Sequence, residues 1–402
     1  MEIIFNVFLF AIGYLFISSF KNKLSPNNIN TLKKLAIFHV LFGTYYCFFG
    51  NGDSIGYWNQ AKFMSYEDFM YSIKEDQGTY FMYALNYFPS NVLGMSYFTG
   101  TMLYSLIGFI GLTYFFVIAV ELIQNNPKFK EYYLFPLLFF LPNLHFWSCA
   151  VGKDSILFFC IAVFIYGLMQ PFKRMPMIII GLFLSYLIRP HITLFLLMSF
   201  GIAYFLGKKI SLFRRIVFFG VLIGLAVAIL PMVLKYAKIE EASLDSFNEF
   251  SNQKVTLLST ANTTSAVDIS SYPFPLKVLT FLYRPFFFDI NGIPSIIASL
   301  ENFLLLLLSY KVIRNKPIKV FKKAPFIIQG MVYFLIIGTL AFSQSLGNLG
   351  IMLRMRNMFL PGLLLFILWH LSYIENKQEE DNLIIELDNE NKTNLASLEI
   401  KR

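Results

Sequence analysis

Runs of apolar residues recur along the whole chain, and most are close to the length that a helix needs to cross a lipid bilayer. About 20 helical residues span roughly 30 Å of hydrocarbon. Of the 402 residues, 56% are hydrophobic and only 14% are charged. A soluble chain would carry about a quarter charged residues. The sequence therefore predicts an all-α integral membrane protein.

Eleven runs predict about 11 transmembrane helices, within a range of 10–12 because several runs are short. Residues 151–154 separate one pair of neighbouring runs, and residue 191 separates another. We expect each pair to form two separate spans, a broken helix or a helical hairpin. The runs are 2–20, 35–50, 98–122, 133–150, 155–170, 176–190, 192–207, 216–235, 292–313, 326–343 and 358–373.

The distribution of Lys and Arg between the loops predicts the orientation of the chain. Short loops on one side hold 18 cations, at residues 21–34, 128–130, 173–174, 208–215 and 311–323. The other side holds 11, mostly in two long segments, which count little in the positive-inside rule. We therefore expect the N-terminus outside and the C-terminus inside the cytoplasmic (inner) membrane. The net charge of +9 follows from this distribution, and no concentrated basic face predicts nucleic-acid binding.

The chain divides into a membrane domain, 1–373, and an acidic tail, 374–402, expected to be disordered or partly helical in the cytoplasm. Two long outer segments, 51–97 and 236–291, interrupt the membrane domain. The stretches MSYEDFMYSIKE and TYFMYALNYF in the first segment predict helices on the membrane surface. Their aromatic residues fit an interfacial belt, which we favour, or platforms for sugar rings. The three cysteines have no metal-ligand spacing and are interpreted as packing residues.

Charged residues gather at the outer ends of the apolar runs, where the positive-inside rule does not favour positive charge. Two arginines there directly precede a proline, which disfavours helical backbone at the arginine. Charges in such places usually face the interior of the bundle and are functional candidates. A single arginine could equally extend to the outer headgroups, but that reading weakens for the whole group. The residues are Arg189 and His191 in YLIRPHI, Arg284 and Asp289 in YRPFFFDI, and Arg354 and Arg356 in IMLRMRN.

The stretch PNLHFWSCAVGKDS, residues 142–155, places Lys153 and Asp154 between two apolar runs. It lacks the first glycine of a phosphate-binding loop, since Trp147 stands five residues before Gly152, and it follows no predicted strand. We expect an outer turn that directs both side chains into the cavity of the arginines. A structural salt bridge from Lys153 to an acid of another segment is the competing interpretation.

A cationic cavity at the outer surface suits an anionic lipid head. Arginine binds phosphate oxygens through two donors, and several arginines can hold a diphosphate. If the diphosphate is the leaving group of a polyprenyl-linked sugar, the arginines also stabilise the charge that develops. The acceptor hydroxyl would benefit from a carboxylate base, and Asp53 in NGDSIGYW is the best-placed candidate. A turn aspartate that binds its own backbone is an equal alternative for Asp53. We expect Asp53, Lys153 and Asp154 to be catalytic residues. The expected substrate ligands are the residues at the ends of the apolar runs, Arg189, His191, Arg284, Asp289, Arg354 and Arg356.

An outer-loop acid followed by surface helices and a many-helix bundle resembles the GT-C class of membrane glycosyltransferases. The order GDSIGYW, QGTYFMYALNY and PNLHFWSCAVGKDSILFF is more similar to the exopolysaccharide and O-antigen repeat-unit polymerases of the Wzy/EpsG-like group. The EpsG-like members more often have an Arg-Gln pair where this chain has Lys153 and Asp154. The resemblance, over roughly 51–356, implies a glycan polymerase with an external active site, Asp53 as base, and diphosphate ligands at Arg189, Arg284, Arg354 and Arg356.

Alternative functions are an O-antigen-ligase-like transferase, a flippase or transporter for lipid-linked glycans, and a non-catalytic scaffold that docks through its tail. A transporter predicts ionisable groups at mid-bilayer and a repeat. His39 lies in the second run, but no repeat is visible. We expect no cofactor, and nothing in the sequence supports a divalent metal. The expected partners are a polyprenyl-linked oligosaccharide and membrane lipid, with other polysaccharide-assembly proteins left open.

Overall fold

The computed structural model describes residues 2–50, 52–75, 78–207, 211–237, 243–259 and 264–399. These residues form an all-α protein with one two-stranded antiparallel hairpin, β1 (Lys128–Phe129) and β2 (Tyr132–Tyr133). The all-α prediction is confirmed. In chain order, the other elements before residue 207 are α1 (Glu2–Ser18), α2 (Pro26–Phe49), α3 (Asp53–Phe63), α4 (Tyr66–Glu75), α5 (Thr79–Tyr87), η1 (Phe88–Val92), α6 (Tyr97–Leu122), α7 (Leu134–Leu137), η2 (Leu138–Phe140), α8 (Pro142–Phe146), α9 (Lys153–Leu168), α10 (Met175–Ile188) and α11 (Pro190–Leu206).

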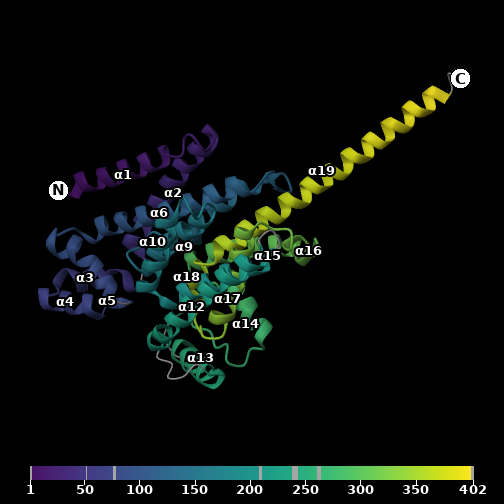
Figure 1. Cartoon of the computed structure of the whole chain (residues 1–402). Coiled ribbons are helices and arrows are strands. Elements are labelled where there is room, and N and C mark those ends of the chain that lie inside the picture. Colours follow the sequence, from purple (N-terminus) through teal and green to yellow (C-terminus); the bar gives the residue numbers. More distant parts are fainter. Residues whose placement is uncertain are drawn as a thin grey trace.

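The second half of the chain is also helical throughout its described residues. Its elements are α12 (Leu212–Ala237), α13 (Leu244–Ser259), α14 (Phe274–Tyr283), η3 (Phe287–Asp289), α15 (Ile293–Arg314), α16 (Pro317–Phe321), α17 (Phe326–Ser343), α18 (Leu349–Arg356) and α19 (Leu360–Glu399). Figure 1 shows α3, α4 and α5 gathered at one end of the bundle and α19 extending away from it toward the C-terminus.

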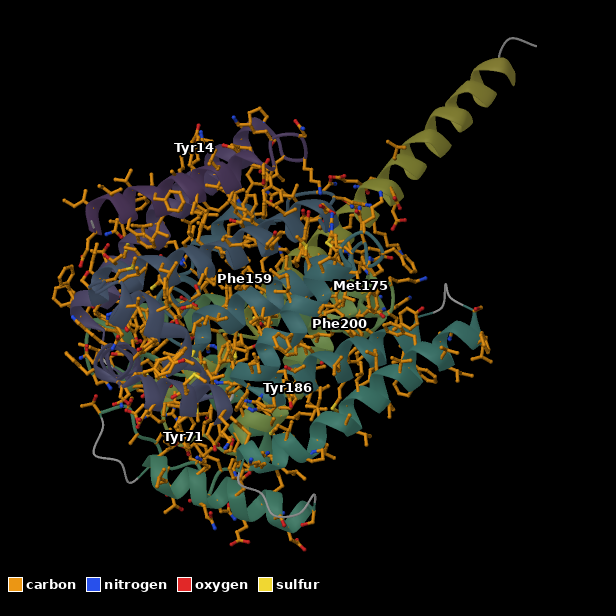
Figure 2. All side chains as sticks on the ribbon, turned by 60° about the vertical axis from the view of Figure 1, so that its left-hand side comes forward. Tyr14, Tyr71, Phe159, Met175, Tyr186 and Phe200 are labelled. Atoms are coloured by element: carbon orange, nitrogen blue, oxygen red, sulfur yellow. The ribbon has the colours of Figure 1, made fainter. Side chains whose placement is uncertain are left out.

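Among the described residues, four helices are long and apolar enough to cross a membrane: α6, α12 (over Arg215–Tyr236), α15 and α17. A fifth span results if α18 and the start of α19, bent by 60° at a short break, count as one. Exposed apolar side chains cover much of the outside, and Figure 2 shows carbon predominating among them. Several apolar helices of this kind are compatible with a multi-pass membrane protein.

The prediction of about 11 transmembrane helices is not supported. Ten of the apolar runs do become helices, but α1, α10 and α11 have only 17, 14 and 17 residues. At 1.5 Å per residue, such helices reach only about 21–26 Å. The run 133–150 is not a continuous helix, because α7, η2 and α8 break it into short pieces. Hydropathy marked these segments correctly as apolar without showing that they are short or broken.

The centre of the bundle is formed by α6 and α9, whose residues are mostly buried. Helix α9 packs against α6 and α10, while α11 packs against α17 and α12. Glycine permits the closest approach between α6 and the turn before α9, because a Cβ on Gly108 would lie 1.7 Å from the carbonyl oxygen of Ser148. This contact holds the start of α9, where Lys153 and Asp154 lie, against the core.

The two expected outer segments contain helices. Residues 51–97 hold α3, α4, α5 and η1, so the helices predicted in MSYEDFMYSIKE and TYFMYALNYF are confirmed. Residues 236–291 include α13 and α14.

The acidic tail, expected to be disordered or partly helical, continues α19 as far as Glu399. No glycine or proline follows Gly362 in this helix, so no residue there strongly opposes helical backbone. Residues up to Ser372 are buried against the bundle, and residues 377–383 are exposed.

Candidate functional site

Asp154 lies in the first turn of α9, where the free backbone N–H groups of a helix favour a negative charge. Its side chain is buried, and each of its two carboxylate oxygens forms an ion pair with an arginine. Burial alone would raise the pKa of Asp154, but Arg354 and then Arg189 attract the carboxylate and lower the pKa below its ordinary value. The carboxylate is therefore held in its charged form.

Arg189 occupies the break between α10 and α11. It precedes Pro190 and has extended backbone, with φ −149° and ψ 91°, as the proline requires. Its Nη1 lies 3.1 Å from Oδ1 of Asp154, and both side chains are about nine-tenths buried. The same nitrogen donates to the sulfur of Met355 at 3.2 Å and lies 3.7 Å from that of Met358. Thioether sulfurs are weak acceptors, so this guanidinium retains capacity to bind a stronger one.

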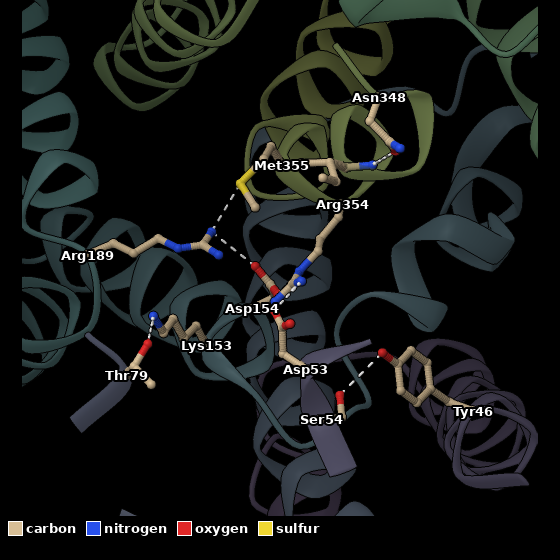
Figure 3. Close-up of polar contacts among 11 residues, drawn as sticks. Tyr46, Asp53, Ser54, Thr79, Lys153, Asp154, Arg189, Asn348, Arg354 and Met355 are labelled. Carbon is tan, nitrogen blue, oxygen red and sulfur yellow. Dashed lines mark hydrogen bonds and ion pairs between the residues drawn. The ribbon is translucent and has the colours of Figure 1, made fainter. Parts of the chain in front are cut away.

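Arg354, on α18, joins two carboxylates that are far apart in the sequence. Its Nε donates to Oδ2 of Asp154, and its Nη1 donates to Oδ2 of Asp53 at 3.1 Å. Figure 3 shows the side chains of Asp53, Asp154, Arg189 and Arg354 converging from separate segments. Asp53, Lys153, Asp154, Arg189 and Arg354 together are named the Asp154 cluster below.

Lys153 is buried beside this group, and its Nζ donates to Oγ1 of Thr79 at 3.1 Å. The ammonium also lies 5.8 Å from the centre of the Tyr57 ring. Burial and then the neighbouring Arg189 lower the pKa of Lys153 to about 8, although Asp154 acts in the opposite direction. With Lys153 protonated, three cations face two carboxylates, and the Asp154 cluster carries a net positive charge. No ion pair links Lys153 to an acid of another segment within the described residues, so the competing salt-bridge interpretation finds no support there.

Asp53 begins α3 and is the most exposed member of the Asp154 cluster, with 59% of its side chain accessible. Gly52, with φ 139°, lies in a region that favours glycine and redirects the chain between α2 and α3. The next residue, Ser54, donates to the hydroxyl of Tyr46 at 3.2 Å, which ties the start of α3 to α2. The carboxylate is thus accessible and fixed beside the partly buried Arg354.

His191 follows Arg189 in the sequence but is not joined to the Asp154 cluster by any hydrogen bond or ion pair in the described structure. Its ring lies among aromatic rings, 5.6 Å from Tyr236 and 5.9 Å from both Phe195 and Phe342. This environment is that of a packing residue.

Arg284 and Asp289 form a separate pair. Nε of Arg284 donates to Oδ2 of Asp289 at 3.0 Å, Nη2 donates to Oδ1, and Nη1 lies 3.3 Å from the hydroxyl of Tyr272. Asp289 also accepts from the backbone N–H of Phe286 at 2.8 Å. The pair closes the turn after α14, and Arg284 has extended backbone before Pro285, as its sequence context predicts.

Arg356 is fully buried and faces away from the Asp154 cluster. It donates to the carbonyl oxygen of Leu282 and, at 2.6 Å, to Oδ1 of Asn302. Asn302 in turn donates to the carbonyl oxygen of Pro285 at 2.9 Å. These contacts join α14, α15 and α18, so Arg356 organises the support of the site.

Several residues of this region were missed by sequence reasoning. Glu301 is buried in α15 and accepts from the backbone N–H of Asn143 at 2.9 Å. An acidic residue within an apolar run indicates a functional candidate, and Glu301, in ENF of the run 292–313, is such a residue. Thr79 and Met355, by contrast, have no distinguishing sequence signal.

His39 and His145 are both buried, with their Nδ1 atoms 3.0 Å apart, and form another polar pair inside the bundle.

A cavity of about 290 Å³ is lined by sequence neighbours of the Asp154 cluster and by none of its five residues. It is bounded by α2, α8, the start of α15 and α18, and its lining includes Gly50, Trp147, Asp289 and Leu353. Gly50 stands three residues before Asp53, and Leu353 directly precedes Arg354, so the cavity and the cluster share the α2–α3 connection and helix α18. This space is named the aromatic cavity below.

Within the described residues, no group of three or more His, Cys, Asp or Glu side chains is placed to hold a metal ion. The Asp154 cluster itself contains arginine, lysine and carboxylate groups. A scan against protein-family models finds no match for this chain, and searches of curated proteins and of solved structures also return none.

Proposed function

We propose that the chain is a membrane glycan polymerase or glycosyltransferase that uses polyprenyl-diphosphate-linked sugars at the outer face of the cytoplasmic membrane, in the synthesis of cell-surface polysaccharide. The observation that carries the proposal is the pairing of Arg189 and Arg354 with the two oxygens of Asp154. One carboxylate fixes the buried Arg189 and the partly buried Arg354, and this preorganisation supports binding of a phosphate-containing head.

Arg189 is the first proposed diphosphate ligand. Its present acceptors beyond Asp154 are methionine sulfurs, which phosphate oxygens would replace favourably. Arg354 is the second ligand, and Lys153 contributes a nearby positive charge. The net positive charge of the Asp154 cluster then offsets the negative charge that accumulates on the leaving diphosphate.

Asp53 is the proposed base. A hydroxyl oxygen of the acceptor sugar forms a bond to the anomeric carbon of the donor, and the bond from that carbon to the diphosphate oxygen breaks. The bonding electron pair leaves with the diphosphate, and the proton of the acceptor hydroxyl passes to the carboxylate of Asp53. Movement of Arg354 from Asp53 onto the diphosphate would release the carboxylate for this step.

The experiment compares Arg189→Lys and Arg354→Lys with the wild type in cells that depend on this chain for their polymer. Lysine keeps the charge but loses the planar pair of donors. We expect polymer to fall by about a hundredfold, the scale of removing one transition-state donor. Single lipid-linked repeat units should accumulate at the outer face. Arg314→Lys, at an exposed arginine in the last turn of α15, is the matched control.

Undiminished polymer in both variants, with normal protein levels, would contradict the proposal. Accumulation of the repeat units at the inner face would instead favour a flippase, because transport across the membrane would then be the blocked step.

A further inference from the structure

The aromatic cavity combines two kinds of wall. One part is formed by aromatic side chains, including Phe42, Tyr45, Phe146 and Trp147. The ring of Phe146 lies 6.3 Å from that of Tyr45 and 4.8 Å from that of Trp147, so these side chains form a continuous aromatic surface. The lining also contains Asp289, Asn291, Ser265 and Ser295, which supply hydrogen-bonding groups.

Trp147 contributes its ring, rather than its N–H group, to the wall of the cavity. Its indole Nε1 is shielded from solvent, so an oxygen atom in the cavity does not reach it. The aromatic face is therefore the part of Trp147 that a ligand in the cavity contacts.

The mixture of aromatic faces and hydrogen-bonding groups fits a sugar ring. A pyranose has apolar C–H faces that pack on aromatic rings, and hydroxyl groups around its edge that need polar partners. Ligand pockets commonly join apolar walls with a few placed polar groups, and a volume of 290 Å³ accommodates a single small ring. An alkyl chain would require only the apolar wall.

The position of the cavity relates this ring to the Asp154 cluster. Leu349, Gly350 and Leu353 of α18 line the cavity, while Arg354 of the same helix binds Asp53 and Asp154. A sugar bound in the cavity would therefore contact the helix whose Arg354 binds the proposed base.

We propose that the aromatic cavity binds a sugar ring of the acceptor glycan, packed against Trp147 and neighbouring aromatic rings. The cavity's affinity for a sugar stands on its own lining, and only the naming of that sugar as the acceptor rests on the proposed function. The polar wall selects a hydroxylated ring over an apolar ring of similar size.

Saturation-transfer NMR on the full chain in lipid nanodiscs tests the inference. The probes are the methyl β-glycosides of glucose, galactose and N-acetylglucosamine, with cyclohexanol as an apolar ring. We expect at least one glycoside to receive saturation on its ring protons and to bind about two- to tenfold more weakly to Trp147→Leu, since loss of an aromatic contact is worth roughly 0.5–1.5 kcal/mol. Trp147→Phe, which keeps a smaller aromatic face, should bind with intermediate affinity.

Trp369→Phe, in α19, is the matched control and should bind the glycoside as the wild type does. The inference is overturned if no glycoside binds, if cyclohexanol binds equally well, or if Trp147→Leu leaves glycoside binding unchanged. Asp53→Asn separates the two proposals, because it should abolish polymer while preserving glycoside binding. If the variants lose polymer but the protein binds no glycoside, this inference alone is wrong. If the protein binds the glycoside and polymer stays normal in Asp53→Asn and in both arginine variants, the proposed function alone is wrong.

Discussion

Arg189 Nη1 lies 3.1 Å from Oδ1 of Asp154, and this ion pair is buried between the break of α10 and α11 and the first turn of α9. Arg354 binds the other oxygen of the same carboxylate from α18. One carboxylate thus positions two arginines from segments that are far apart in the sequence, and the stability of this arrangement depends on Asp154.

Replacement of Asp154 by asparagine should destabilise the protein strongly. The change leaves two largely buried arginines without their shared anion, and breaking one partner of a buried ion pair costs roughly 3–5 kcal/mol. We expect a clearly lower Tm in thermal unfolding of the purified protein. Asp245→Asn removes an exposed acid from the first turn of α13 and controls for the loss of a helix-terminal charge. Equal Tm changes in the two variants would show that the Asp154 ion pairs contribute nothing.

Lys153 predicts a pH dependence of stability. Its folded-state pKa of about 8 lies below the ordinary 10.5, so between these values the unfolded chain binds more protons than the folded one. The free energy of unfolding therefore rises as pH increases from about 8 to 10.5, because the Lys153 ammonium loses its proton in the folded protein. Below pH 8 the cost of burying the ammonium is fully present.

Thermal unfolding of Lys153→Met across this range measures the effect. The variant keeps an unbranched apolar side chain without the charge, so its Tm advantage over wild type should be largest below pH 8 and should shrink toward pH 10.5. Lys74→Met, at an exposed position, controls for the change in net charge. A constant difference between Lys153→Met and wild type over the whole range would contradict the assignment.

The close packing at Gly108 should make this position intolerant of alanine. A Cβ there would meet the carbonyl oxygen of Ser148 at 1.7 Å, so backbone must move apart, and overpacking typically costs about 1–3 kcal/mol. Gly224→Ala is the matched control in α12, where a Cβ meets nothing within 4 Å and should stabilise the helix by about 0.5–1 kcal/mol. Tm should fall for Gly108→Ala and not for Gly224→Ala; a tolerated Gly108→Ala would place the two segments farther apart than described here.

Local sequence signals predicted part of the candidate site. The proline after Arg189 and the proline after Arg284 correctly indicated extended backbone at both arginines, because this restriction acts between adjacent residues. Asp53, Lys153 and Asp154 were also identified as charges beside apolar runs. Which of these charges meet depends on how distant helices pack, so the separation of Arg189 and Arg354 from the Arg284–Asp289 pair could not be derived from order alone.

Arg354 and Arg356 illustrate the same limit within one helix. They are two positions apart, and about 100° of rotation per residue places them on different faces of α18. Sequence reasoning grouped them by composition, whereas Arg354 joins the Asp154 cluster and Arg356 binds Leu282 and Asn302. The predicted number of membrane spans finds no support for a related reason, since hydropathy records apolar character and not whether a run stays helical over a full bilayer thickness.

The most direct test of the account is the rate of polymer formation by Asp53→Asn, measured in membranes supplied with lipid-linked repeat units from cells that lack this chain. Asparagine keeps the size and hydrogen-bonding capacity of Asp53 but cannot accept the proton, and a general base is worth about 10²–10⁴-fold. Because the side chain is 59% exposed, Tm should change little. The account predicts a loss of at least about a hundredfold in rate with an unchanged Tm. A rate near that of wild type would contradict it, leaving Asp53 as a turn residue and Asp154 and Asp289 as the carboxylates to test.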